Sequence, residues 1–257
     1  MSEGIHPLAC VDPGAKLGDG VNVGPFAVIE ADTEIGDGTR IAAHAVIKRY
    51  SKIGARNRIH EGAVIGGEPQ DYKFGGWVSH VEIGDDNRIR EGVTIHRSSK
   101  EGGVTRVGSN NFLMAFCHIA HDCLLGNNIV IANATLLGGH VEIEDRAFIS
   151  GAVTIHQFCR IGTLAMVGGN ARVTQDCLPY IITEGLPAQA RALNLVGIKR
   201  AGFSREDMQA LKRAYMALRA GTSLDASLES MDSLGVGVVD RLATFIRASK
   251  RGFAHPA

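Results

Sequence analysis

The chain has 257 residues, and its 27 lysines and arginines are balanced by 27 aspartates and glutamates. A formal net charge of zero gives no reason to expect nucleic acid or a charged membrane surface as a general partner. Five cysteines without a C-x-x-C pair argue against a disulfide framework or a thiolate metal site, and neither a leader pattern nor a long apolar run occurs, so we expect a cytoplasmic protein.

A repeat of six residues begins near the start of the chain. Almost every sixth residue from Ile5 to Val173 is isoleucine, valine or leucine, and the residue four places later is usually small, as at Ala27 and Ala45. This period fits a short strand plus a corner, so that three hexads form one coil stacked on the next. The few aromatic residues suit a narrow core. The pattern predicts an all-β solenoid, a parallel β-helix, over residues 1–190.

Two interruptions of this repeat predict loops extruded from the coil, near residues 68–79 and 98–105. They contain the exceptions to the aliphatic pattern, Asp71, Trp77 and Glu101. Loops on repeat proteins often carry the binding residues, although a merely tolerated insertion would leave the same pattern.

The densest polar cluster is Cys117-His118-Ile119-Ala120-His121-Asp122-Cys123. With coils of eighteen residues, Gly139 should lie directly above His121, and His140 above Asp122. Acyl transfer needs a base for the attacking hydroxyl and an N–H donor for the developing oxyanion, and a glycine leaves its N–H accessible. His121 and Gly139 are therefore candidates for these two roles.

Other interpretations of this cluster stay open. The histidines could simply occupy solvated rungs, or His118 and His121 could bind zinc, as in β-helix enzymes that hydrate carbon dioxide. Cys117 or Cys123 could be a thiol nucleophile, but both occupy the small inward position of the repeat, which favours buried filler.

Beyond Val173 the spacing of apolar residues becomes helical. A helix is expected to begin after an N-cap at Ser204 and to stop at Gly221, followed by helices near 224–231 and 236–250. Residues 191–257 are therefore predicted to form a C-terminal α-helical domain.

Several motifs in order resemble the UDP-N-acetylglucosamine acyltransferases, a family of hexapeptide-repeat enzymes. They are Asn87-Arg88-Ile89-Arg90-Glu91, Val93-Thr94-Ile95-His96-Arg97, His118-Ile119-Ala120-His121-Asp122, His156-Gln157-Phe158-Cys159 and Lys199-Arg200-Ala201-Gly202-Phe203-Ser204. The resemblance implies a left-handed β-helix and a homotrimer with the site between subunits. It also implies transfer of a 3-hydroxyacyl chain from acyl carrier protein to the 3-hydroxyl of UDP-N-acetylglucosamine, the first step of lipid A biosynthesis. No resident cofactor or metal is implied, since the phosphopantetheine arrives on the carrier protein.

The same resemblance assigns roles to individual residues. His121 is the general base of a mechanism without a covalent intermediate, Asp122 supports it, and the N–H of Gly139 stabilises the oxyanion. Substrate contacts are implied for Gln70, Asp71, Lys73, His96, His118, His140, His156, Gln157, Asn194 and Arg200. The acyl-chain slot is assigned to Met166 and Gly169, and the period stacks Gly169 with the short residues Ala115, Asn133 and Gly151.

Two departures from the family pattern lie in the segment after Asn194. Val196 stands where many relatives have an acid, and Ala201 where they have a second arginine. Some relatives acylate a UDP-sugar with a 3-amino group in place of the 3-hydroxyl, so this acceptor stays an alternative. A non-catalytic hexapeptide scaffold is a further one.

Overall fold

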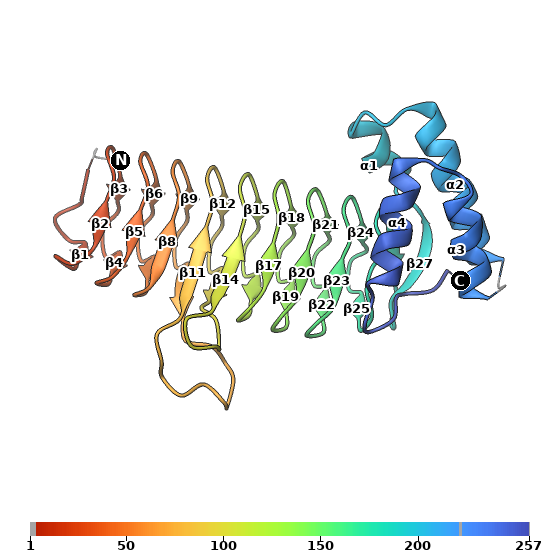
Figure 1. The fold of residues 1–257 in the computed structure, drawn as a ribbon. Coiled ribbons are helices and arrows are strands. Elements are labelled where there is room, and N and C mark those ends of the chain that lie inside the picture. The colour runs from red at the N-terminus through yellow and green to blue at the C-terminus, as the bar shows by residue number, and fades with distance from the viewer. Residues whose placement is uncertain (1–3, 221–222, 257) are drawn as a thin grey trace.

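The molecule is an elongated rod of stacked coils with a group of helices at one end (Figure 1). A computed structural model describes residues 4–220 and 223–256. The fold-class prediction is confirmed, because three sheets built of short repeated strands run along the rod before the helices begin.

Each coil contributes one strand to each sheet. The first sheet contains β1 (Cys10–Val11), β4 (Val28–Ile29), β7 (Val46–Ile47), β10 (Val64–Gly67), β13 (Thr94–His96), β16 (His118–Ile119), β19 (Leu136–Leu137), β22 (Thr154–Ile155) and β25 (Arg172–Val173). The second sheet contains β2 (Lys16–Leu17), β5 (Glu34–Ile35), β8 (Ser51–Ile53), β11 (His80–Ile83), β14 (Val104–Val107), β17 (Leu124–Leu125), β20 (Glu142–Ile143) and β23 (Arg160–Ile161). The third sheet contains β3 (Asn22–Val23), β6 (Arg40–Ile41), β9 (Arg58–Ile59), β12 (Arg88–Ile89), β15 (Phe112–Leu113), β18 (Val130–Ile131), β21 (Phe148–Ile149), β24 (Met166–Val167), β26 (Ile181–Glu184) and β27 (Gln189–Leu193).

The register of these sheets follows the predicted coil. Strands pair in parallel with the equivalent strand one coil later, so that Val28 faces Val46 and Leu136 faces Thr154. The inward aliphatics and the small residues four places after them form one continuous buried core. Because β27 pairs antiparallel with β26 and spans residue 190, the strand crosses the boundary expected between the two domains.

Both predicted interruptions of the repeat leave the rod on one side, between β10 and β11 and between β13 and β14 (Figure 1). Across the first, Val64 pairs with Thr94 rather than with residue 82. Across the second, Val81 pairs with Thr105 rather than with residue 99. We call residues 68–79 the first loop and residues 98–103 the second loop.

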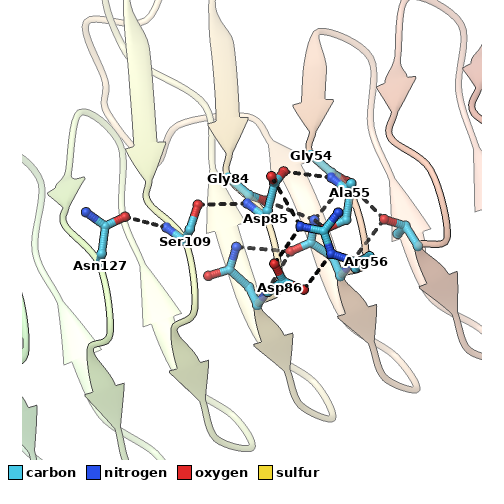
Figure 2. A network of polar contacts seen from close by, with 11 residues as sticks. Gly54, Ala55, Arg56, Gly84, Asp85, Asp86, Ser109 and Asn127 are labelled. Carbon is cyan, nitrogen blue, oxygen red and sulfur yellow. Dashed lines mark hydrogen bonds and ion pairs between the residues drawn. The ribbon is translucent and has the colours of Figure 1, made fainter.

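At one edge of the rod, polar side chains bind the corner N–H groups of the preceding coil. Asn127 Oδ1 accepts from the N–H of Ser109, Ser109 Oγ from Asp85, and Asp85 Oδ1 from Ala55, at 2.8, 2.9 and 2.8 Å (Figure 2). These corner amides point along the rod and have no partner in a neighbouring strand. The side-chain oxygens therefore accept hydrogen bonds from N–H groups that would otherwise be left unsatisfied.

The C-terminal helices are α1 (Leu195–Arg200), α2 (Arg205–Arg219), α3 (Leu224–Asp232) and α4 (Gly237–Arg247). Ser204 caps α2 in a capping box with Asp207, as expected, whereas the expected stop at Gly221 lies outside the described residues. The last helix ends at Arg247 rather than near residue 250. Within residues 4–220 and 223–256, no helix has both the length and the apolar character needed to cross a membrane.

Candidate active site

The corners between the first and second sheets bring together most of the predicted site residues. Because of the eighteen-residue coil, three consecutive corners stack Asp122, His140 and Phe158 in one column, and the neighbouring column holds His121, Gly139 and Gln157. We call this strip the histidine edge; its residues are His96, His118, His121, Asp122, Gly139, His140, His156 and Gln157.

His121 and Asp122 form a hydrogen-bonded pair. His121 Nδ1 lies 2.7 Å from Asp122 Oδ2. Burial on its own would raise the pKa of Asp122, but hydrogen bonds from Ser98, His121 and Ser99 outweigh it and lower that pKa to about 2. Asp122 is therefore ionised at neutral pH and fixes which ring nitrogen of His121 faces the carboxylate, leaving Nε2 for chemistry.

The imidazole of His121 is largely enclosed. Its corner position would let the side chain project from the coil, but only 11% of it is exposed. It lies between the backbone of Gly139 and the ring of His140, which approaches edge-on with 5.3 Å between centroids. The sequence spacing predicts the corner on which His121 lies. The exposed fraction of its ring depends on how the next coil packs against it.

Gly139 combines two properties at this point. A Cβ at this position would lie 2.7 Å from His121 Nε2, so no residue with a side chain fits beside the ring as it stands. The N–H occupies the same place in the hexad as the corner amides of Figure 2, yet no described residue accepts a hydrogen bond from it. Glycine thus leaves a free N–H donor beside the imidazole.

The neighbouring histidines are shifted toward their neutral forms. Burial, with the charges of His118 and His121, lowers the pKa of His96 to about 4. Burial and the charge of His121 lower the pKa of His118, whose Nδ1 lies 2.7 Å from Thr94 Oγ1. Burial also lowers the pKa of His140. At neutral pH these rings can donate or accept hydrogen bonds to a substrate without adding charge.

The first loop carries three expected substrate contacts on its surface. Gln70 and Lys73 are exposed and Asp71 is half-buried. The Asp71 carboxylate accepts from the N–H of Lys73 at 3.0 Å and lies close enough to His140 to favour its charged form. Trp77 of this loop donates to the carbonyl of Ser99, whose hydroxyl donates to Asp122, so the first loop packs beside the histidine edge of its own chain. His156 and Gln157, one coil further on, are exposed.

Three further expected residues lie elsewhere, on the outer face of the third sheet. A cavity of about 630 Å³ there is lined by Met166, Asn194 and Arg200, together with both departures, Val196 and Ala201. Asn194 caps α1, a helix that the sequence reading missed, and its Nδ2 donates to the carbonyl of Leu164 at 2.9 Å. We call this the third-sheet cavity, and within one chain it is a different surface from the histidine edge.

The small-residue column is present as stacked corners. The N–H of Asn170 donates to the carbonyl of Gly151, and that of Ala152 to the carbonyl of Asn133. Gly169 is exposed, and a Cβ on it would meet only ordinary contacts, at 3.6 Å to the carbonyl oxygen of Gly151. A substituent at this position would therefore project from the corner without displacing the backbone.

Two alternative chemistries can be judged by geometry. His121, Asp122 and His140 place ligand atoms within 4.8 Å of one another and could hold a metal ion, whereas His118, which we considered as a zinc ligand, is not in that group. Cys117 and Cys123 are buried as expected, and burial raises their pKa values to about 11 and about 12. Neither thiol is poised as a nucleophile.

Sequence reasoning missed Ser98 and Ser99. Both lie in the second loop, both are buried, and their hydroxyls donate to the Asp122 carboxylate. The interruption of the repeat is the only sequence signal for them, since it marks the loop but not its conformation.

Comparisons with known proteins agree on one family. A family model described as "Udp N-acetylglucosamine O-acyltransferase; Domain 2" matches residues 176–254, and one described as bacterial transferase hexapeptide matches residues 14–49. An acyl-[acyl-carrier-protein]–UDP-N-acetylglucosamine O-acyltransferase of Alkalilimnicola ehrlichii is 50% identical over 96% of this chain and 98% of its own length. The match to the enzyme of the same name from Synechocystis, 48% identical, covers 66% of this chain and 62% of that relative. The crystal structure of Francisella novicida UDP-N-acetylglucosamine acyltransferase superposes with a TM-score of 0.95 at 38% identity, over 99% of this chain and 94% of the other.

Proposed function

The chain belongs to the UDP-N-acetylglucosamine O-acyltransferase family, and from this premise we propose that it transfers a 3-hydroxyacyl chain from acyl carrier protein to the 3-hydroxyl of UDP-N-acetylglucosamine. This reaction is the first step of lipid A biosynthesis. The observation that carries the proposal is the pairing of His121, held by Asp122, with the free N–H of Gly139. A base and an oxyanion donor side by side are the two groups that direct acyl transfer requires.

In the proposed mechanism, Nε2 of His121 removes the proton of the sugar 3-hydroxyl as its oxygen attacks the thioester carbonyl. The N–H of Gly139 donates to the oxyanion of the tetrahedral intermediate. Collapse of that intermediate breaks the carbon–sulfur bond, and the imidazolium returns its proton to the departing pantetheine sulfur. Asp122, ionised at neutral pH, stabilises the imidazolium between these steps. No covalent acyl-enzyme forms, which agrees with the burial of Cys117 and Cys123, the two cysteines next to these histidines in the sequence.

We further propose that a second copy of the chain completes each site, in a homotrimer. Most outward residues of the second sheet are charged, and several are paired, as in Lys16 with Glu34. The third sheet instead presents Phe112, Val130 and Phe148 in register, and Phe148 is 40% exposed. An apolar strip of this kind favours association, and a neighbouring copy would bring the third-sheet cavity to the histidine edge.

A 3-amino UDP-sugar is the second candidate acceptor. It is favoured by the position of Val196 and Ala201, the two departures from the family pattern, in the lining of the third-sheet cavity. The same base would then deprotonate an attacking amine, and the product would be an amide instead of an ester.

Incubation with each UDP-sugar and a panel of 3-hydroxyacyl carrier proteins, followed by mass analysis, tests this function. We expect a product whose mass equals the UDP-sugar plus one 3-hydroxyacyl group. Mild alkali should release the acyl group from an ester and leave an amide intact. A chelator in a parallel reaction should not slow turnover; full loss of activity there would show that the transfer depends on a metal ion, and absence of any acyl product would contradict the proposal.

A further inference from the structure

The structure assigns Ser98 and Ser99, both in the second loop, as positioning residues that hold the Asp122 carboxylate against His121. This inference rests on the proposed role of His121 as the base. The second loop is an insertion of six residues that a regular coil lacks, and it supplies both serines.

Three donors from the second loop reach the carboxylate. Ser98 Oγ donates to Asp122 Oδ1, while Ser99 Oγ and the N–H of Ser99 donate to Oδ2 at 2.8 and 3.1 Å. Oδ2 is also the oxygen that binds His121 Nδ1. Both carboxylate oxygens are thus occupied, so the plane of the carboxylate and the direction in which it faces the imidazole are fixed.

The corner backbone of Asp122 is held as well. Its N–H donates to Thr105 Oγ1 at 2.7 Å, at the start of the strand that follows the second loop. Asp122 itself has a φ of 61°, the left-handed corner conformation that His140 and Phe158 share in the next two coils.

The first loop braces the second. Trp77 Nε1 donates to the carbonyl of Ser99 at 3.1 Å, and Ser79 Oγ donates to the carbonyl of Ser98. Arg97, only 5% exposed, lies over the rings of Tyr50 and Phe74. The two loops therefore form one packed unit, and both serines are buried within it.

The charge around the pair determines how removal of the hydroxyls should affect the reaction. His140 Nε2 lies 3.7 Å from Asp122 Oδ2, and Lys100 and Asp71 act on His140 with opposite signs. On the other side of the His121–Asp122 pair, burial lowers the pKa of His96 and of His118, which favours their neutral forms. Hydrogen bonds from Ser98 and Ser99 are among the causes that lower the pKa of Asp122, so their removal should raise that pKa and let the carboxylate take up a proton at higher pH. The acidic limb of the pH profile should therefore move to higher pH.

The test uses the full chain with both serines replaced, Ser98→Ala/Ser99→Ala, in the wild-type and the Asp122→Asn backgrounds. In the wild-type background we expect kcat to fall roughly tenfold, the rate equivalent of one charge-assisted hydrogen bond, with the KM for the UDP-sugar within about twofold. The acidic limb of kcat/KM should shift to higher pH. In the Asp122→Asn background the same replacements should change kcat less than about twofold, because both serines act through the carboxylate.

Two controls separate positioning from folding. Ser99→Thr, made in the otherwise wild-type chain, keeps the hydroxyl and should show the wild-type pH profile. Ser109→Ala removes a corner hydroxyl that binds the N–H of Asp85 and has no contact with Asp122, so it should leave the profile unchanged. If the double variant does not fold, Ser99→Ala alone is measured in the same way, since the backbone N–H of Ser99 still supports the carboxylate.

Equal losses in both backgrounds, or an unmoved acidic limb, would overturn the assignment of the serines. A His121→Ala variant in the same series keeps this failure distinct from failure of the proposed function. If His121→Ala is inactive while the serine variants behave as wild type, only the serine assignment is wrong. If His121→Ala stays active, the proposed base is wrong.

Discussion

Replacement of His121 by alanine is expected to lower kcat by about a hundred- to ten-thousand-fold, the range typical of a general base. The imidazole is the only described group placed both against an ionised carboxylate and beside the free N–H of Gly139. Since Nδ1 of His121 is bound to Asp122, Nε2 is the ring nitrogen that can take the proton of the acceptor hydroxyl. The steady-state rate of acyl transfer at saturating substrates measures the effect.

The control for this experiment is His60→Ala. His60 is a half-buried corner histidine that approaches Glu61 and Glu91 but makes no contact with the histidine edge among the described residues. This variant should keep near-wild-type activity. Thermal unfolding of both variants tests whether the coil is intact. We expect an intact coil, because the buried Ile119 and Leu125 on either side of the corner are unchanged. A folded His121→Ala enzyme within about threefold of wild type would rule out the base assignment.

The second large effect concerns the length of the acyl chain. We propose that the wild-type enzyme prefers a long 3-hydroxyacyl chain and that Gly169→Met shifts the preference toward a shorter one. The corner of Gly169 is exposed and open, so the methionine side chain would occupy space along the column of small residues without straining the backbone. Each methylene excluded from an apolar slot costs about 0.8 kcal/mol, so loss of several changes the ratio of specificity constants by orders of magnitude.

Specificity constants for long and short 3-hydroxyacyl carrier proteins, measured in both enzymes, test this proposal. Gly237→Met is a matched control, since a Cβ at Gly237, the first residue of α4, would meet no atom within 4 Å. It adds the same side chain away from the column and should leave the ratio unchanged. A folded Gly169→Met enzyme with the wild-type ratio would show that Gly169 does not line the slot.

What the sequence could predict follows from its period. Residues eighteen apart pair in the regular coils, as Val28 and Val46 do, so the position of Gly139 beside His121 could be deduced without coordinates. The start of α2 could also be predicted, because its N-cap at Ser204 is a local sequence signal. Both predictions depend on short-range or strictly periodic rules, which a single sequence contains in full.

What could not be predicted depends on non-periodic contacts. The hydrogen bonds from Ser98 and Ser99 to Asp122 arise from the conformation of two loops that brace each other, and no spacing rule fixes that conformation. The enclosure of His121 likewise results from side-chain packing against His140. The helix α1, six residues long, has too little apolar periodicity to stand out, and its signal is the cap at Asn194.

The central claim is that one catalytic site combines the histidine edge of one copy with the third-sheet cavity of another. Co-expression of His121→Ala and Arg200→Glu chains with different tags, followed by purification of oligomers that carry both, tests it most directly. Each variant alone should be nearly inactive. Mixed trimers should recover roughly a third of the wild-type rate, because in a ring that contains both variants one of the three sites combines an intact His121 with an intact Arg200. Activity in the mixed oligomers no higher than in the separate variants would contradict the claim.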